Sequence, residues 1–140
     1  MRANWTEIKR GDVLPQSAGI HVTMNLKGEI VINRVTYELL GSPKAFQLLY
    51  DRTNNRIGLK PCALATRNAY PIAVSGKCGG KKIRAYRLAA EHRIDLPYTV
   101  QFSDAEIDED GTLVLDLRTA KESPRAAGYR ERALISSPRN

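Results

Sequence analysis

The stretch IHVTMNLKGEIVIN, residues 20–33, carries the clearest structural pattern in this chain. Apolar and polar residues alternate from Ile20 to Leu26, which is the period of a strand with one buried face. Lys27-Gly28 then provides a turn, and residues 30–32 predict a second strand. Asn33 is suited to cap a helix, because its side chain can accept a hydrogen bond from a free backbone N–H of the first turn. A β-hairpin followed directly by a helix is therefore predicted.

The residues after this stretch complete one β-β-α-β-β unit. A short helix is predicted through Val35 and Leu40, and it should stop at Gly41. Residues 45–50 and 56–60 predict two further strands, joined by the turn residues between them. The first unit thus covers about residues 19–61.

The chain repeats this order when it is shifted by about 52 residues, which brings Val22 onto Val74 and Gly28 onto Gly80. The second unit covers about residues 69–117, with a helix over 87–93 and a long acidic connection over 103–111. Each unit alone would leave strand edges open, but two units can cover one another. We therefore expect a mainly β fold with short helices, in which two tandem β-β-α-β-β units close into one pseudo-symmetric barrel. Its expected core is Ile20, Val22, Ile32, Phe46, Leu48, Tyr50, Ile72, Val74, Val100, Phe102, Leu113 and Leu115.

The segments outside the two units have a different composition. Residues 1–18 predict a loosely ordered N-terminal arm, and residues 118–140 a disordered basic tail. No apolar run approaches the roughly 20 residues that a membrane-spanning helix needs. The N-terminus has no apolar signal region and the two cysteines have no metal-ligand spacing, so a cytoplasmic protein with reduced thiols is expected.

No motif points to an enzyme. The acidic run from 104 to 110 resembles a calcium loop, but Leu117 stands where a loop starting at Glu106 needs its bidentate glutamate. The glycine-rich segment 76–80 lacks the ending of a phosphate-binding P-loop. His92 occupies a half-buried helix position, and neither histidine has a partner at catalytic spacing. We expect a non-catalytic protein without a cofactor or metal.

Basic residues suggest where a partner would bind. The chain has 22 Lys and Arg against 15 Asp and Glu, a net charge of +7. Such a balance favours anionic partners, although it also serves solubility alone. The densest cluster lies in the second hairpin and helix, where open glycine amides accompany the cations. The candidate DNA-binding residues are Lys77, Lys81, Lys82, Arg84, Arg87, Lys27 and Arg34.

The segment KGEIVIN, residues 27–33, together with Leu40-Gly41, resembles the swapped-hairpin transcription regulators of the AbrB and MraZ type. The tandem arrangement is similar to MraZ, which carries two such units per chain. This resemblance implies a swapped-hairpin barrel that binds duplex DNA through basic side chains of the hairpins, usually within a homo-oligomer. The family carries Arg after the turn glycine and Pro before the helix. Here those positions are Glu29 and Asn33, and in the second unit Lys81 and Ala85.

Two further functions compete with DNA-binding regulation. The double unit could be a protein-interaction or assembly scaffold without nucleic-acid binding. Binding of single-stranded nucleic acid across a sheet face ranks last, because aromatic residues are only 6% of the chain and such binding relies on exposed rings.

Overall fold

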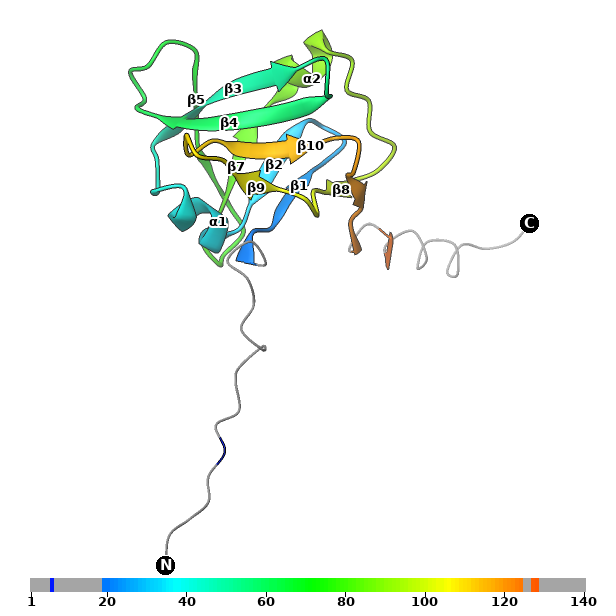
Figure 1. Cartoon of the computed structure of the whole chain (residues 1–140), viewed down its shortest axis with the longest axis horizontal. Helices are drawn as coiled ribbons and strands as arrows, with labels where there is room; N and C mark the ends of the chain where they lie inside the picture. The colour runs from blue at the N-terminus through cyan, green and yellow to red at the C-terminus, as the bar shows by residue number, and fades with distance from the viewer. Residues whose placement is uncertain (1–5, 7–18, 125–126, 129–140) are drawn as a thin grey trace, which may run out of the picture.

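The computed structural model describes Thr6, residues 19–124 and residues 127–128. Two antiparallel sheets and two short helices make up this part of the chain (Figure 1). The mainly β fold expected from the sequence is confirmed. The predicted N-terminal arm, Thr6 apart, lies outside the described residues.

The first sheet, sheet A, has six strands and the second, sheet B, has five. In spatial order, sheet A contains β11 (Lys121–Glu122), β8 (Val100–Gln101), β1 (Val22–Met24), β2 (Glu29–Ile32), β7 (Gly80–Arg84) and β6 (Ala73–Ser75). Sheet B contains β5 (Ala69–Pro71), β3 (Ala45–Asp51), β4 (Arg56–Cys62), β10 (Leu113–Asp116) and β9 (Glu106–Ile107). Three of the predicted hairpins are present as β1–β2, β3–β4 and β6–β7. The fourth, expected between residues 98–102 and 112–117 of the second unit, is wrong, because β8 pairs with β1 and β11 in sheet A whereas β10 pairs with β4 and β9 in sheet B.

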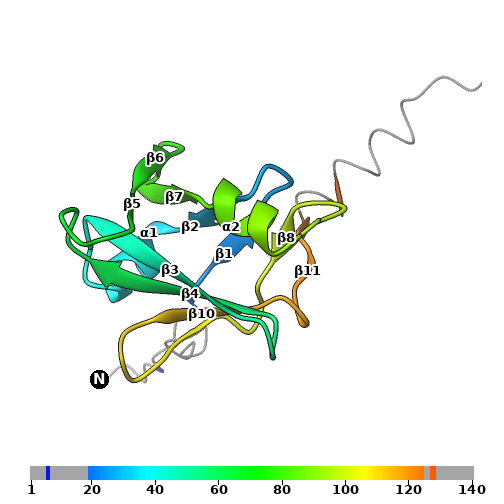
Figure 2. The same cartoon turned by 90° about the horizontal axis from the view of Figure 1, so that it is seen from above.

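The single closed barrel is not found, because the described strands form two separate sheets. Their boundary falls within the predicted first strand of the second unit, which is interrupted at Ile72. Residues before Ile72 pair with β3 in sheet B, and residues after it pair with β7 in sheet A. Seen from above, the strand run therefore bends from one layer into the other (Figure 2).

The apolar core lies between the two sheets. Seven of the expected core residues are buried: Val22, Ile32, Phe46, Val100, Phe102, Leu113 and Leu115. Ile20, Leu48, Tyr50 and Ile72 are partly buried against them. The prediction for Val74 is wrong, since its side chain is 69% exposed on the edge strand β6, where no further strand covers it. Buried residues that the sequence argument did not name include Met24, Ile30, Ile57, Leu59 and Ile83.

The two helices begin differently. Asn33 caps α1 (Arg34–Leu39), as predicted, and its side chain accepts a hydrogen bond of 2.9 Å from the Thr36 backbone N–H. Ala85 stands at the corresponding place before α2 (Tyr86–Glu91) and provides no side-chain cap. Packing of Leu88 into the core therefore has to hold α2 in place.

The chain stays in the sheet beyond residue 117. Strand β11 pairs with β8, and the Ser123 backbone N–H donates to the Thr99 carbonyl at 2.9 Å. Residues 118–124, which the sequence assigned to the disordered tail, thus complete the edge of sheet A. Most of the predicted tail, residues 125–126 and 129–140, lies outside the described residues.

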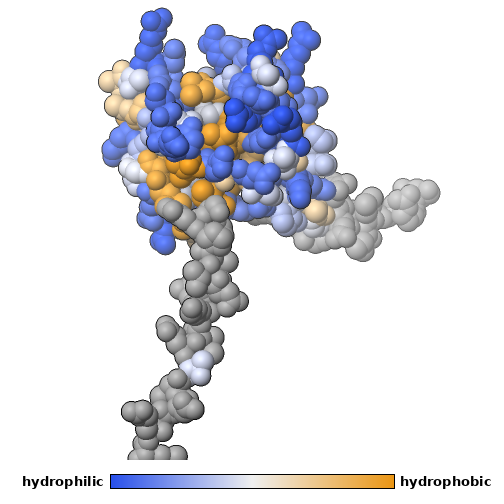
Figure 3. All heavy atoms as spheres, in the orientation of Figure 1, coloured by the Kyte–Doolittle hydropathy of each residue, from blue (hydrophilic) through white to orange (hydrophobic). Residues whose placement is uncertain are grey.

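The opposite side of the molecule is the outer face of sheet B. It is largely hydrophilic with apolar side chains gathered between the polar ones (Figure 3). Leu49 is exposed there, in register with Gly58 and Val114. On one flank of this apolar row, Arg56 forms an ion pair of 2.9 Å with Asp51.

Candidate nucleic-acid interface

The outer face of sheet A carries a row of side chains in register across all six strands. The row runs Lys121, Gln101, Thr23, Val31, Lys82 and Ala73, each paired with the next. Paired residues of neighbouring strands point to the same face, and Val31 lies between the buried Ile30 and Ile32, so this row faces outward. The centre of the row is uncharged, and a lysine lies toward each side.

A shallow hollow of about 590 Å³ lies over this face. Its lining consists of His21, Thr23, Asn25, Val31, Ser75, Thr99, Gln101, Ser123 and Pro124. None of these is Lys, Arg, Asp or Glu. Six of the nine residues carry a hydroxyl or a side-chain amide, and such groups can both donate and accept hydrogen bonds.

At one end of the β2–β7 pair, three cations surround Glu29. This group, the Glu29 cluster, consists of Lys27, Glu29, Lys82 and Arg84. The Lys82 ammonium lies 3.7 Å from the Glu29 carboxylate, and Arg84 on β7 is the register partner of Glu29. Glu29 is the one carboxylate in this group, so the cluster has a formal charge of +2.

The Glu29 carboxylate is held in place by neutral partners as well. The Asn25 amide and the Tyr86 hydroxyl each donate to it at 2.9 Å. These two hydrogen bonds, followed by the charges of Lys82 and Lys27, lower the pKa of Glu29. The same contact with Glu29 raises the pKa of Tyr86. Glu29 therefore stays ionised and partly neutralises Lys82.

Arg34 and Lys77 form a second cationic group at the other end of the β2–β7 pair. The Arg34 side chain lies against Gly79, where a Cβ atom would be 2.9 Å from the Arg34 Cδ. Gly79 also has a positive φ of 84°. A residue with a Cβ atom would therefore strain the backbone here and would also clash with Arg34. The two cations line a hollow of about 580 Å³ with Asn33, Val35, Cys78 and Gly79. Glu38 lies 3.9 Å from Arg34, but both side chains are exposed, which makes the pair weak.

Two of the predicted DNA-binding residues lie elsewhere. Lys81 pairs with Ile32 and so points to the opposite face of β7 from Lys82. Its ammonium group lies 5.3 Å from the centre of the Tyr37 ring. Arg87 lies on the exposed side of α2 and forms an ion pair of 3.1 Å with Glu91. The structure therefore divides the seven candidates into the Glu29 cluster, the Arg34–Lys77 group and these two separate residues.

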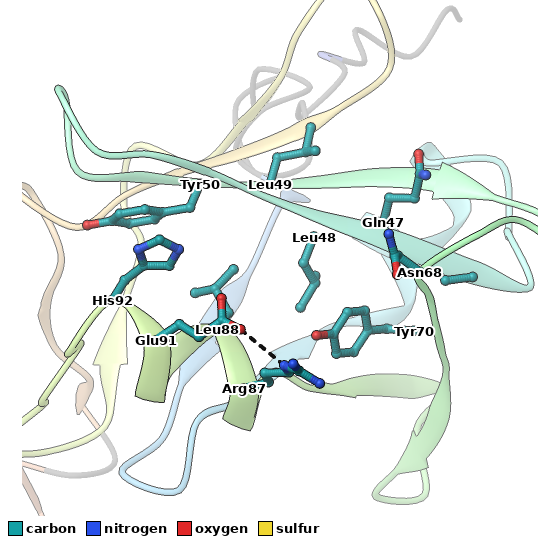
Figure 4. A pocket seen from close by; sticks show the side chains of 11 residues that line it. Gln47, Leu48, Leu49, Tyr50, Asn68, Tyr70, Arg87, Leu88, Glu91 and His92 are labelled. Carbon is teal, nitrogen blue, oxygen red and sulfur yellow. Dashed lines mark hydrogen bonds and ion pairs between the residues drawn. The ribbon is translucent and has the colours of Figure 1, made fainter.

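Arg87 borders a hollow of about 680 Å³ between β3 and α2. Leu48 and Leu88 point into it, and Tyr70 faces Arg87 across it (Figure 4). At its other end the His92 ring stacks on Tyr50 with ring centres 4.2 Å apart. The half-buried position predicted for His92 is confirmed. Of the ionisable lining residues, His92 thus packs on a ring and Glu91 is paired with Arg87.

The sequence did not reveal the uncharged row Gln101, Thr23 and Val31, because it joins segments about 75 residues apart along the chain. The Asn25–Glu29 contact carried a weak signal, since both residues flank the predicted turn. The opposite orientations of Lys81 and Lys82 follow from the two-residue period of a strand and could have been read from the sequence.

The described residues contain no group of three or more His, Cys, Asp or Glu that could hold a metal ion. Likewise, no helix in this part of the chain is long and apolar enough to cross a membrane. No family model, curated protein or solved structure matches the chain.

Proposed function

We propose that this chain is a non-catalytic, transcription-regulator-like protein that binds duplex DNA through the outer face of sheet A. The observation that carries the proposal is the placement of cations at both ends of the β2–β7 pair. Lys27, Lys82 and Arg84 lie at one end, and Arg34 and Lys77 at the other. The ends are four residues apart, from Glu29 to Asn33, which is about 13 Å at roughly 3.3 Å per residue.

This spacing suits a DNA groove. The major groove of B-DNA is about 12 Å wide and admits a two-stranded β-ribbon. Cations at the two ends of the ribbon would then lie near the phosphates of the two groove walls. The uncharged hydroxyl and amide groups on β1 and β8, beside this ribbon, would face base edges, which are read by hydrogen bonds. The acidic residues 104–110 surround β9 in sheet B, on the other layer, where they would not oppose the phosphates.

A pseudo-symmetric swapped-hairpin arrangement of the two units is part of the proposal. Two strand pairings support it, because each joins strands at corresponding places in the units: β2 with β7 around Ile30 and Ile83, and β4 with β10 around Gly58 and Val114. A third observation concerns the turns. A Cβ atom on Gly28 would lie 3.4 Å from Tyr86, the first residue of α2, and Gly79 lies against Arg34, the first residue of α1. Each hairpin turn thus contacts the helix of the other unit.

Under this arrangement Lys82 is the counterpart of Glu29, because Ile30 and Ile83 face one another across the approximate axis. The sequence alignment had matched Glu29 with Lys81, one residue away. The two counterparts are the partners of the 3.7 Å ion pair. Glu29 would therefore reduce the affinity for phosphate mainly by engaging Lys82, and Arg84 and Lys27 would remain available.

The test is a titration of the full chain into a fluorescein-labelled 20-base-pair duplex, followed by fluorescence anisotropy at several salt concentrations. The double variant Lys82→Ala, Arg84→Ala should weaken binding and reduce the slope of log affinity against log salt by at least about 0.9, the value for one lost phosphate contact, because Arg84 is available whereas Glu29 engages Lys82. Lys60→Ala, an exposed lysine on sheet B, is the matched control and should leave the slope unchanged. If the wild-type chain does not bind the duplex at low salt, the proposal is wrong.

A further inference from the structure

The two hairpins of sheet A differ in what lies beside their first strands. Strand β1 has β2 on one side and β8 on the other. Strand β6, the first strand of the second hairpin, pairs with β7 alone in the part of the chain that the structure describes. The backbone N–H and C=O groups on its other side can therefore accept an added strand. We propose that an extended, acidic segment of a partner protein pairs with this edge of β6.

The surface beside β6 is apolar where an added strand would lie. A hollow of about 280 Å³ is lined by Tyr37, Lys44, Leu64, Pro71, Ile72, Ala73, Val74 and Lys81. Val74 is 69% exposed and Leu64 is 60% exposed, although both are large aliphatic residues. Val74 pairs with Lys81, so the two side chains share one face of the sheet. An aliphatic side chain of the incoming strand would remove Val74 and Leu64 from water.

The charges around the hollow specify an acidic occupant. Lys44 and Lys81 both line it, and no Asp or Glu does. Neither lysine belongs to an ion pair among the described residues. Lys81 lies over the Tyr37 ring, which holds its ammonium group beside the edge. Carboxylates on the incoming strand would form ion pairs with both lysines.

The same charges disfavour two other occupants. A second copy of this chain, paired through its own β6, would bring a second Lys44 and a second Lys81 against the first pair, and like charges repel. Duplex DNA would satisfy the lysines, but it offers neither a strand edge to pair with β6 nor aliphatic side chains for Val74 and Leu64. The proposed strand site is also separate from the DNA face, since Val74 and Lys81 point away from the outer row that contains Lys82.

The test uses the full chain and a fluorescein-labelled peptide of eight residues with the repeat Val-Thr-Asp-Thr, in which the Val and Asp side chains share one face of an extended strand. The same peptide with Lys in place of Asp is the charge-reversed probe. Anisotropy at about 0.15 M salt should show binding of the acidic peptide only. Lys44→Glu and Val74→Asp should each weaken it at least tenfold, whereas Lys60→Glu, an equal charge change at an exposed lysine of β4, should change it less than twofold. Both Lys44 and Lys60 are exposed, so these variants should remain folded.

Three results would overturn the proposal. Equal weakening by Lys44→Glu and Lys60→Glu would mean that the peptide responds only to net charge. If excess unlabelled duplex displaces the peptide from wild type and from the Lys82→Ala, Arg84→Ala variant alike, DNA binds at this edge. If the chain does not bind the peptide but self-associates in sedimentation, and Val74→Asp abolishes that self-association, the occupant is a second copy. In contrast, slowed amide hydrogen exchange of residues 73–75 on addition of the acidic peptide would support strand pairing at β6.

Discussion

Replacing Asn33 with alanine should destabilise the fold by about 2–4 kcal/mol, through three hydrogen bonds. The Asn33 Oδ1 accepts from the Thr36 backbone N–H at 2.9 Å, and loss of such a helix cap costs about 1 kcal/mol. The Asn33 amide donates to the Gly19 carbonyl at 3.1 Å, a bond worth about 1 kcal/mol. The Thr36 hydroxyl also donates to Asn33 while its oxygen accepts from the His21 backbone N–H, and Thr36 is fully buried, so loss of a partner for the O–H donor would cost a further ~1 kcal/mol.

Urea unfolding followed by circular dichroism measures this loss as a lower midpoint with an unchanged slope. The control is Asn33→Asp, which keeps the acceptor for Thr36 and loses only the donor to Gly19. We expect it to cost about 1 kcal/mol or less. A cost below 0.5 kcal/mol for Asn33→Ala, or equal costs for both variants, would refute the reasoning that the cap joins α1 to the start of β1.

Three other variants test the remaining features. Glu29→Gln keeps an acceptor for Asn25 and Tyr86 but releases Lys82, so it should strengthen duplex binding and steepen the salt slope by up to about 0.9, measured by anisotropy. Leu59→Ala should cost about 2–5 kcal/mol in urea unfolding, because Leu59 is fully buried at the centre of sheet B. Hydrogen bonds from Asn54, followed by those from Arg56, lower the pKa of Asp51 from 3.8 to about 2. Asp51 should therefore stabilise the fold fully above pH 4 and lose this effect as the pH falls toward 2, a loss that Asp51→Asn should not show.

The sequence was sufficient to predict three of the hairpins and both helices, but not the strands that pair with residues 98–102 and 112–117. Apolar and polar residues alternate regularly through the first hairpin, and Asn33 is suited to cap a helix, so both the first hairpin and its helix are correctly predicted. For the last strand of each unit the shift is 56 residues rather than 52, which aligns Ile57 and Leu59 with Leu113 and Leu115, and these two strands pair with one another. These features depend on local patterns, which a single sequence displays.

Register in the second hairpin could not be predicted in the same way. Residues 76–80 contain three glycines, so several turn lengths are compatible with the chain, and Ile83 and Ala85 provide only two inward-facing positions. An error of one residue moves every side chain of a strand to the other face. That is why the sequence alone matches Lys81, rather than Lys82, with Glu29.

The short strands were missed for a different reason. Strands β9 and β11 have two residues each, and neither has an apolar pattern of its own. They form because β10 and β8 offer free edges after the core has assembled. The candidate site also depends on the tertiary arrangement, since its uncharged row combines residues from β8, β1 and β2. Composition identified the cations, but only the tertiary arrangement determines which of them share a face.

The pairing of β1 with β8 has a consequence for how the protein is made. Met24 pairs with Val100, so one neighbour of the first strand is synthesised about 76 residues later. At roughly 5–20 residues per second, a ribosome needs about 4–15 s to cover that distance. During this interval the nascent β1–β2 hairpin presents unpaired backbone on the side that β8 will cover, and long-range pairings of this kind slow folding. Until residues 100–101 have been synthesised, that side of β1 is open to pairing with other strand edges.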